Sequence, residues 1–141
     1  MVKYLLLLMA LAFAGCTGNG GVEQQMAGAE PLAAGELPKA GQKVTFVELG
    51  SLNCIPCRQM QPVMQAVEKK YGVQLKVVFY DIWNPKQRQY AEKYGIRVIP
   101  TQVFLDSAGK EFFRHEGFYS EEQIDVLLKR QGLVPLSGKQ R

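Results

Sequence analysis

The amino-acid sequence predicts an α/β fold in which a central mixed sheet carries helices on both faces. Two observations support this prediction. Short β-branched and aromatic runs alternate along the chain with segments of helical periodicity, and the last two of these runs flank a tight turn. The predicted order is strand, helix, strand, helix, strand, strand, helix, which is typical of a sheet that combines a parallel crossover with a hairpin.

The first three elements follow from apolar patterning. The run VTFVEL at residues 44–49 predicts a strand. Apolar side chains then recur at helical spacing from Met60 to Tyr71, and Gly72 ends that helix. The run LKVVFYDI at residues 75–82 is almost continuously apolar, which predicts a second strand buried on both faces.

The last four elements carry clear start and turn signals. Asn84 and Pro85 predict the start of a helix that ends at Gly95. The runs TQVFLD and EFFRHE lie on either side of the turn SAGK, so they predict a β-hairpin. Ser120 and Gln123 have the spacing of a capping box, which predicts the start of the last helix.

The N-terminal residues predict export and a lipid anchor. Lys3 precedes 11 apolar residues, too few for a membrane-spanning helix of about twenty but typical of a signal peptide. The small residues before Cys16 resemble the lipobox of bacterial lipoproteins, which implies that residues 1–15 are removed and that Cys16 is lipidated. The alternative is an ordinary secretory signal with an incidental cysteine. We expect an exported lipoprotein, anchored to a membrane through its N-terminal lipid and facing the periplasm or the cell exterior.

The remaining chain divides into three segments. Residues 16–42 contain six glycines and few large apolar side chains, so they predict a flexible tether. Residues 43–132 form the predicted domain, and residues 133–141 a C-terminal tail. The formal net charge of +4 is spread along the chain without a run of five or six like charges, so nothing indicates a nucleic-acid partner.

The segment SLNCIPCRQMQP holds the candidate catalytic residues, Cys54 and Cys57. They lie between the first strand and the first helix, where catalytic groups of open α/β sheets gather. The unpaired N–H groups at a helix start favour a thiolate at Cys54, and Pro56 is tolerated in the first turn. Spacing of three residues places both sulfurs within reach of a disulfide. Such a short loop contributes little as a structural staple, so the pair predicts a redox centre.

Metal binding is the alternative function of this pair. Structural zinc takes four ligands, and the chain offers at most Cys54, Cys57 and its single histidine, His115. Copper(I) accepts fewer ligands and prefers thiolates, so a copper(I)-handling envelope module remains the second hypothesis. His115 is otherwise expected at the surface.

Glu48 is a third candidate catalytic residue. It shares strand parity with Val44 and Phe46, so it lies on an apolar face. This pattern predicts a buried carboxyl group with a raised pKa that exchanges the proton of Cys57 through water. The alternative is a glutamate on an edge strand that points into solvent.

Several motifs resemble the thioredoxin family over residues 43–132. CIPC carries the proline of that family's Cys-Gly-Pro-Cys motif, a basic residue follows, and Pro62 matches the proline of the active-site helix. KYGIRVIPT resembles the segment that ends in the family's cis-proline, here Pro100, and Gly117 matches the glycine after the hairpin. Two positions differ from the family pattern: Asn53 replaces the usual tryptophan before the first cysteine, and the buried acid is a glutamate.

The resemblance implies a thioredoxin-like fold and thiol–disulfide oxidoreductase activity without a bound cofactor. Cys54 would attack a disulfide, and Cys57 would resolve the mixed disulfide. A cis peptide before Pro100 would place that residue and Ile99 beside the cysteines, where the backbone of Ile99 pairs with a client strand. The expected partners are protein disulfide or dithiol clients, with a membrane thiol reductase or another thioredoxin-like protein as electron partner.

The dipeptide between the cysteines bears on the direction of electron flow. Ile55 and Pro56 lie where a bound client would contact them, and neither offers a side-chain hydrogen bond or a charge to a thiolate. A strong oxidant needs such stabilisation of its reduced form, so we expect a reductant or a near-neutral exchanger. Trp83 is expected to contribute to packing, and the alternative is that it lines the rim of the site.

Overall fold

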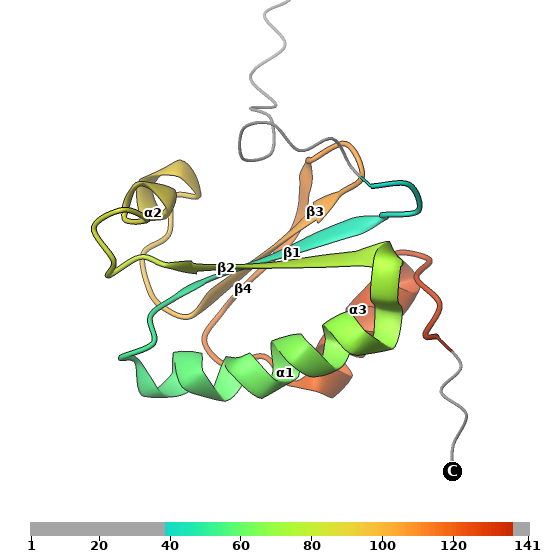
Figure 1. The fold of residues 1–141 in the computed structure, drawn as a ribbon, viewed down its shortest axis with the longest axis horizontal. Helices are drawn as coiled ribbons and strands as arrows, with labels where there is room; N and C mark the ends of the chain where they lie inside the picture. Colours follow the sequence, from blue (N-terminus) through green and yellow to red (C-terminus); the bar gives the residue numbers. More distant parts are fainter. Residues whose placement is uncertain (1–38, 137–141) are drawn as a thin grey trace, which may run out of the picture.

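The computed structural model describes residues 39–136, and these form one α/β domain (Figure 1). The predicted order of strands and helices is confirmed, with one additional 3-10 turn, η1. In chain order the elements are β1 (Val44–Gly50), α1 (Ile55–Tyr71), η1 (Gly72–Gln74), β2 (Leu75–Asp81), α2 (Gln89–Lys93), β3 (Thr101–Asp106), β4 (Glu111–Glu116) and α3 (Glu121–Arg130). The predicted signal peptide, Cys16 and most of the predicted tether lie outside the described residues.

The four strands form one mixed sheet in the order β2-β1-β3-β4. β1 is parallel to β2 and antiparallel to β3, and β3 and β4 form the predicted hairpin. All seven residues of β1 are buried because β1 has a neighbour on each side and helices above and below. The prediction that β2 is buried on both faces is only partly correct: its side chains pack into both cores, but β2 is an outer strand and five of its seven residues are only partly buried.

Helices cover both faces of the sheet, as predicted (Figure 1). On one face α1 and α3 pack against the sheet, and their core contains Phe46, Met60, Phe104 and Leu128. On the other face α2 lies over the second core, and the ring of its Tyr90 stacks on Tyr80 of β2 at a centroid distance of 3.6 Å. Even-numbered residues of β1 therefore face α1 and α3.

The predicted start of α2 is wrong by four residues. The segment from Asn84 forms successive turns, in which the Asn84 carbonyl accepts from the N–H groups of Gln87 and Arg88. The Gln87 side chain also accepts from the N–H of Asp81 at 2.8 Å, which attaches this segment to the end of β2. The helix begins only at Gln89, so tertiary contacts override the Asn-Pro start signal.

The ends of α1 and α3 follow the sequence signals. Gly72 has φ +55° and ends α1, and both reciprocal bonds of the predicted Ser120–Gln123 capping box are present. Packing continues past residue 132, because Leu133 is buried and the N–H of Leu136 donates to the Lys70 carbonyl. Among residues 39–136, no helix is long and apolar enough to cross a membrane.

Candidate active site

Cys54 and Cys57 form a disulfide at the connection between β1 and α1. Their Cα atoms are 5.2 Å apart. A short turn, residues 51–54, connects the end of β1 to the start of α1, and the Cys54 N–H donates to the Ser51 carbonyl at 3.1 Å. The three-residue spacing therefore places both sulfurs within bonding reach, as predicted.

Cys54 is the N-cap residue of α1. Its φ and ψ of −98° and 125° are extended, and its sulfur accepts a hydrogen bond from the Cys57 N–H at 3.4 Å. The following Pro56 lies in the first turn, where the missing N–H has no helical partner to lose. In the reduced protein this backbone donor and the helix dipole both favour a thiolate at Cys54.

The two sulfurs differ in accessibility. Cys54 is 9% exposed, whereas Cys57 is 1% exposed. Cys57 lies in the first turn of α1, against the end of β1. The more exposed cysteine is also the one at the helix N-terminus, so geometry and electrostatics both favour Cys54 as the nucleophile.

Gly50 allows the close contact between β1 and Cys57. A Cβ atom at this position would lie 3.1 Å from Cβ and 3.2 Å from Sγ of Cys57. These contacts are tighter than ordinary van der Waals separations, so a side chain at residue 50 would displace the cysteine. The sequence reasoning missed Gly50; its signal was a glycine ending an otherwise β-branched and apolar strand.

Glu48 lies two residues before Gly50, so both residues face Cys57 and α1. The side chain of Glu48 is fully buried, and burial raises its pKa from 4.5 to about 8. Gln102 Nε2 donates to Glu48 Oε2 at 3.1 Å, which partly offsets this rise. The alternative of a solvent-facing edge glutamate is wrong, because β1 is central in the sheet.

Gln102 is a site residue that the sequence reasoning missed. It pairs with Glu48 in the β1–β3 register and is fully buried. The available signal was its position in TQVFLD, where Gln102 shares a strand face with the buried Phe104. A polar side chain on an apolar face needs a polar partner, and Glu48 is that partner.

Pro100 immediately precedes β3, and the Ile99–Pro100 peptide is cis, as the resemblance implied. Thr101 pairs with Leu49 in the β1–β3 register, so Pro100 lies at the same end of the sheet as Gly50 and the disulfide. The Pro100 carbonyl accepts from the Gly117 N–H at 2.8 Å, which holds the segment in place. The position of this proline therefore agrees with the prediction.

Exposed apolar side chains surround this end of the sheet. They belong to the loops that follow β1, β2 and β4, the first turn of α1 and the loop before β3, and their exposed fractions are 46–66%. We call them the apolar rim: Leu52, Ile55, Trp83, Val98 and Phe118. More than half of the Trp83 surface is exposed, which contradicts the packing prediction and agrees with the alternative that Trp83 lies at the rim of the site.

His115 does not join the cysteines. It lies on β4, partly buried, with its ring stacked on Tyr119 at 4.3 Å, so the surface expectation is only partly correct. Within the part of the chain that the structure describes, no group of three or more His, Cys, Asp or Glu residues is arranged to hold a metal ion. Among residues 39–136, the copper(I) hypothesis would therefore depend on Cys54 and Cys57.

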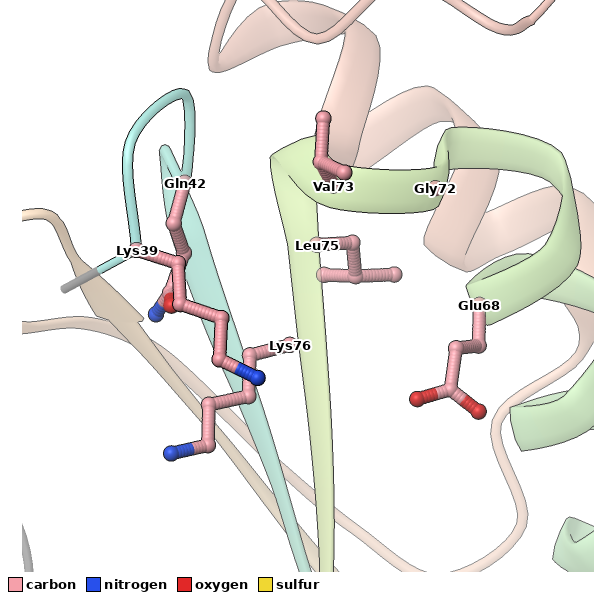
Figure 2. A pocket seen from close by; sticks show the side chains of 7 residues that line it. All are labelled: Lys39, Gln42, Glu68, Gly72, Val73, Leu75 and Lys76. Atoms are coloured by element: carbon pink, nitrogen blue, oxygen red, sulfur yellow. The ribbon is translucent and has the colours of Figure 1, made fainter. Parts of the chain in front are cut away.

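A separate pocket of about 310 Å³, shown in Figure 2, lies at the starts of β1 and β2, the end of the sheet opposite to the disulfide. Its lining comes from the turn before β1, the end of α1, η1 and the start of β2: Lys39, Gln42, Glu68, Gly72, Val73, Leu75 and Lys76. The described chain also begins here, at Lys39. Lys39 and the disulfide therefore lie at opposite ends of β1.

The fold and the site together define a thioredoxin-like redox protein, with a disulfide at a helix N-terminus, a cis-proline beside it and a buried acid behind it. The chain belongs to the family of the thioredoxin-like domain, whose model matches residues 31–132. This assignment confirms the resemblance and the thioredoxin-like fold inferred from the sequence.

Similar proteins agree with this assignment. The chain is 33% identical over 69 residues to the chloroplastic thioredoxin-like protein HCF164 of Oryza sativa subsp. japonica, covering 49% of this chain and 26% of that protein. It is 30% identical over 77 residues to a thioredoxin of Bacillus subtilis, covering 55% and 71% respectively. A mutant thioredoxin from Halobacterium salinarum shares the fold, with a TM-score of 0.56, 20% identity and coverage of 66% and 78%.

Proposed function

We propose that this protein is a thiol–disulfide oxidoreductase of the bacterial cell envelope that reduces disulfides in protein clients. The observation that carries the proposal is the Cys54–Cys57 disulfide, with the more accessible sulfur at the N-cap of α1. The thioredoxin relatives support the general chemistry.

The reaction proceeds by two exchanges of sulfur partners. The Cys54 thiolate attacks one sulfur of a client disulfide, and the other client sulfur leaves as a thiolate that takes up a proton. Cys57 then loses its proton and attacks Cys54 Sγ, which releases the second client sulfur as a thiolate. Two electrons pass to the client, and the Cys54–Cys57 disulfide remains. A membrane thiol reductase or another thioredoxin-like protein restores the dithiol.

Glu48 accepts and returns the proton of Cys57 in this scheme. It is buried on the same face of β1 as the Cys57 contact, and its pKa of about 8 lies close to the pKa of a free thiol. A carboxylate with such a pKa is a suitable base near neutral pH. Transfer through one water molecule would join the two groups.

Clients dock over the apolar rim. Ile55 is 66% exposed in the first turn of α1, and Pro56 follows it. Ile99 and Pro100 lie across the end of the sheet, where the backbone of Ile99 pairs with an extended client segment. Exposed Asn53 replaces the family tryptophan, so Leu52 and Trp83 supply apolar contact beside the disulfide.

A lipid at Cys16 anchors the protein to a membrane of the cell envelope. The tether that follows would span roughly 25–30 Å as a random coil, about one domain diameter. It joins the described domain at Lys39, at the end opposite to the disulfide. The anchored end of the domain is therefore remote from the disulfide, which leaves the disulfide end accessible to clients.

Trapping of mixed disulfides tests the proposed reaction. Cys57→Ser keeps the nucleophile and removes the resolving thiol, so we expect it to accumulate client adducts that reducing agent releases. Cys54→Ser, the matched control, should trap far fewer, and both variants should lose insulin disulfide reduction. A reversed trapping pattern would contradict the assignment of Cys54. Tight, stoichiometric copper(I) binding without exchange activity would instead support the copper-handling alternative.

A further inference from the structure

A polar row crosses the sheet behind the disulfide. Glu48 of β1 pairs with Gln102 of β3, and Gln102 pairs with His115 of β4. The side chains of directly paired residues lie on the same face of a sheet. Figure 1 shows these three strands side by side. The row therefore runs from the buried acid to the chain's single histidine, with Gln102 in the middle.

The Glu48–Gln102 pair leaves one oxygen on each side chain unpaired. Gln102 Nε2 donates to Glu48 Oε2, while Glu48 Oε1 and Gln102 Oε1 are buried without a hydrogen-bond partner. An ionised carboxylate only accepts hydrogen bonds, so this arrangement suits the charged form of Glu48. A neutral carboxyl group carries an O–H that must donate, and Gln102 Oε1 is a buried acceptor beside it.

We propose that Gln102 is a positioning residue whose carboxamide turns over when Glu48 gains or loses its proton, so that both forms have a buried hydrogen-bond partner. The inference rests on the proposed role of Glu48 as the proton acceptor for Cys57. With the ionised acid, Gln102 Nε2 donates to Glu48. With the neutral acid, the turned carboxamide presents Oε1, which accepts from the Glu48 O–H.

Glutamine is suited to this exchange by its shape. The oxygen and the amino group at its end are similar in size, and the terminal torsion has a broad, roughly two-fold profile. Turning the group converts a donor into an acceptor without changing the volume that it fills. Lysine would serve only the ionised form, and an apolar side chain would serve neither.

The other groups around Glu48 are apolar or have hydrogen-bond partners of their own, so Gln102 is the polar partner of Glu48. β2 presents the apolar Phe79 as its register partner, and Asp81 lies two residues further along that strand. α1 presents Cys57, and β4 presents His115 through Gln102. The Asp81 carboxylate accepts from the Trp83 N–H, and His115 Nε2 lies 3.2 Å from the Phe118 carbonyl oxygen.

Side-chain NMR of the oxidised full-length protein tests the proposal, because Cys57 then carries no titrating thiol. We expect the Nε2 and Cδ signals of Gln102 to change with pH at the same midpoint as the Glu48 carboxyl carbon. The contacts of the two amide protons should also differ below and above that midpoint. His115→Asn is the control that replaces the neighbouring imidazole ring. Gln102 signals that stay constant through the Glu48 midpoint would overturn the proposal.

The variant Gln102→Met provides a second, independent test, because methionine has a similar length but lacks the carboxamide. If Gln102 serves both forms, this variant should lose stability at pH 6 and at pH 10, and its resolution step should slow by about threefold to tenfold. Loss of stability at pH 10 alone, with the Glu48 midpoint raised by about one unit, would mean that Gln102 Nε2 remains a donor at every pH. This result would contradict the proposed rotation of the carboxamide. In a Glu48→Gln background the same substitution should leave the pH profile unchanged.

The test also separates this inference from the proposed function. A resolution rate that Glu48→Gln does not alter would overturn the proton role of Glu48. The NMR titration of the oxidised protein would still decide whether the Gln102 carboxamide rotates.

Discussion

Gly50 and Cys57 are in such close contact that a single added methyl group at residue 50 would lie 3.2 Å from the cysteine sulfur. The contact joins the end of the central strand to the first turn of α1. The position of Cys57 relative to Glu48 and Cys54 therefore depends on the absence of a side chain at residue 50.

We expect Gly50→Ala to destabilise the oxidised protein by about 1–2 kcal/mol, the usual cost of overpacking a tight site. The disulfide restrains Cys57, so the reduced form can move the cysteine and should lose less stability. Denaturant unfolding of both redox forms measures the difference. Equal losses in the two forms would mean that the contact does not act through Cys57.

Glu48 should make the protein less stable as the pH rises. Its pKa is about 8 in the folded protein and near 4.5 when unfolded, so unfolding releases a proton between these values. The stabilising contribution is complete below pH 4.5, falls as the pH approaches 8 and is lost above it. Glu48→Gln should remove this decline and stabilise the protein by a few kcal/mol at pH 8.5. Unfolding free energies at pH 5 and 8.5 measure the effect, and parallel pH profiles for the two proteins would contradict it.

Asp125 of α3 should have the opposite pH dependence. Burial acts to raise its pKa, but hydrogen bonds from Lys129, Tyr71 and Lys70 outweigh burial and lower the pKa from 3.8 to about 2. The carboxylate therefore contributes stability above pH 3.8, and this contribution is lost as the pH falls toward 2. Asp125→Asn should cost about 2 kcal/mol at pH 7 and much less at pH 2. Acid unfolding curves of both proteins check the prediction, and an equal cost at both pH values would exclude it.

The apolar rim should determine affinity for protein clients. Leu52 is 54% exposed beside the disulfide, whereas Val126 is 50% exposed on α3. We expect Leu52→Ala to raise KM for a protein disulfide about threefold to tenfold, with little change in kcat, because it removes about 1 kcal/mol of apolar contact. Val126→Ala is the matched control and should have no effect. A similar change in both variants would place the docking surface elsewhere.

The direction of electron flow can be measured by equilibration with glutathione. The Cys57 N–H and the helix dipole are the stabilising contacts of Cys54 in the structure, and both lower the pKa of its thiol in the reduced protein. Because neither contact involves a charged side chain, the pair should remain a reductant or a near-neutral exchanger. A pair that stays reduced while glutathione is oxidised would identify a disulfide donor instead.

Lipidation of Cys16 requires its own test. Cys16→Ser should release the protein from membranes or leave the signal peptide uncleaved. Mass spectrometry of the mature wild-type protein should find a lipid on the first residue. An unmodified Cys16 in the mature chain would exclude the lipid anchor.

Local sequence signals predicted most of the fold. The hairpin strands match their predicted runs, and the capping box at Ser120 forms because both partners lie within one helical turn. The errors concern tertiary placement. An apolar run does not reveal whether a strand is central or outer, so β2 was placed too deep in the sheet. The start of α2 depends on the contact of Gln87 with Asp81, which no local pattern encodes.

The residues of the candidate site also fall into those that local sequence predicts and those that depend on tertiary structure. The cysteines and Glu48 were predictable because spacing and strand parity are local properties. Gln102 was missed, since its role depends on the register between β1 and β3. Gly50 was missed because its contact with Cys57 appears only when the strand and the helix are assembled. The exposure of Trp83 likewise depends on the turns that follow β2.

The capping role of Cys54 links the stability of α1 to the redox state of the protein. A thiolate is a stronger hydrogen-bond acceptor than a disulfide sulfur, so the N-cap of α1 is strongest when the protein is reduced. Folding and oxidation therefore form one thermodynamic cycle. Any energy that the Cys57 N–H contributes to the reduced helix is also energy that oxidation must overcome. A substitution anywhere in the first turn of α1 will change the reduction potential by the amount by which it alters the relative unfolding free energies of the two redox forms.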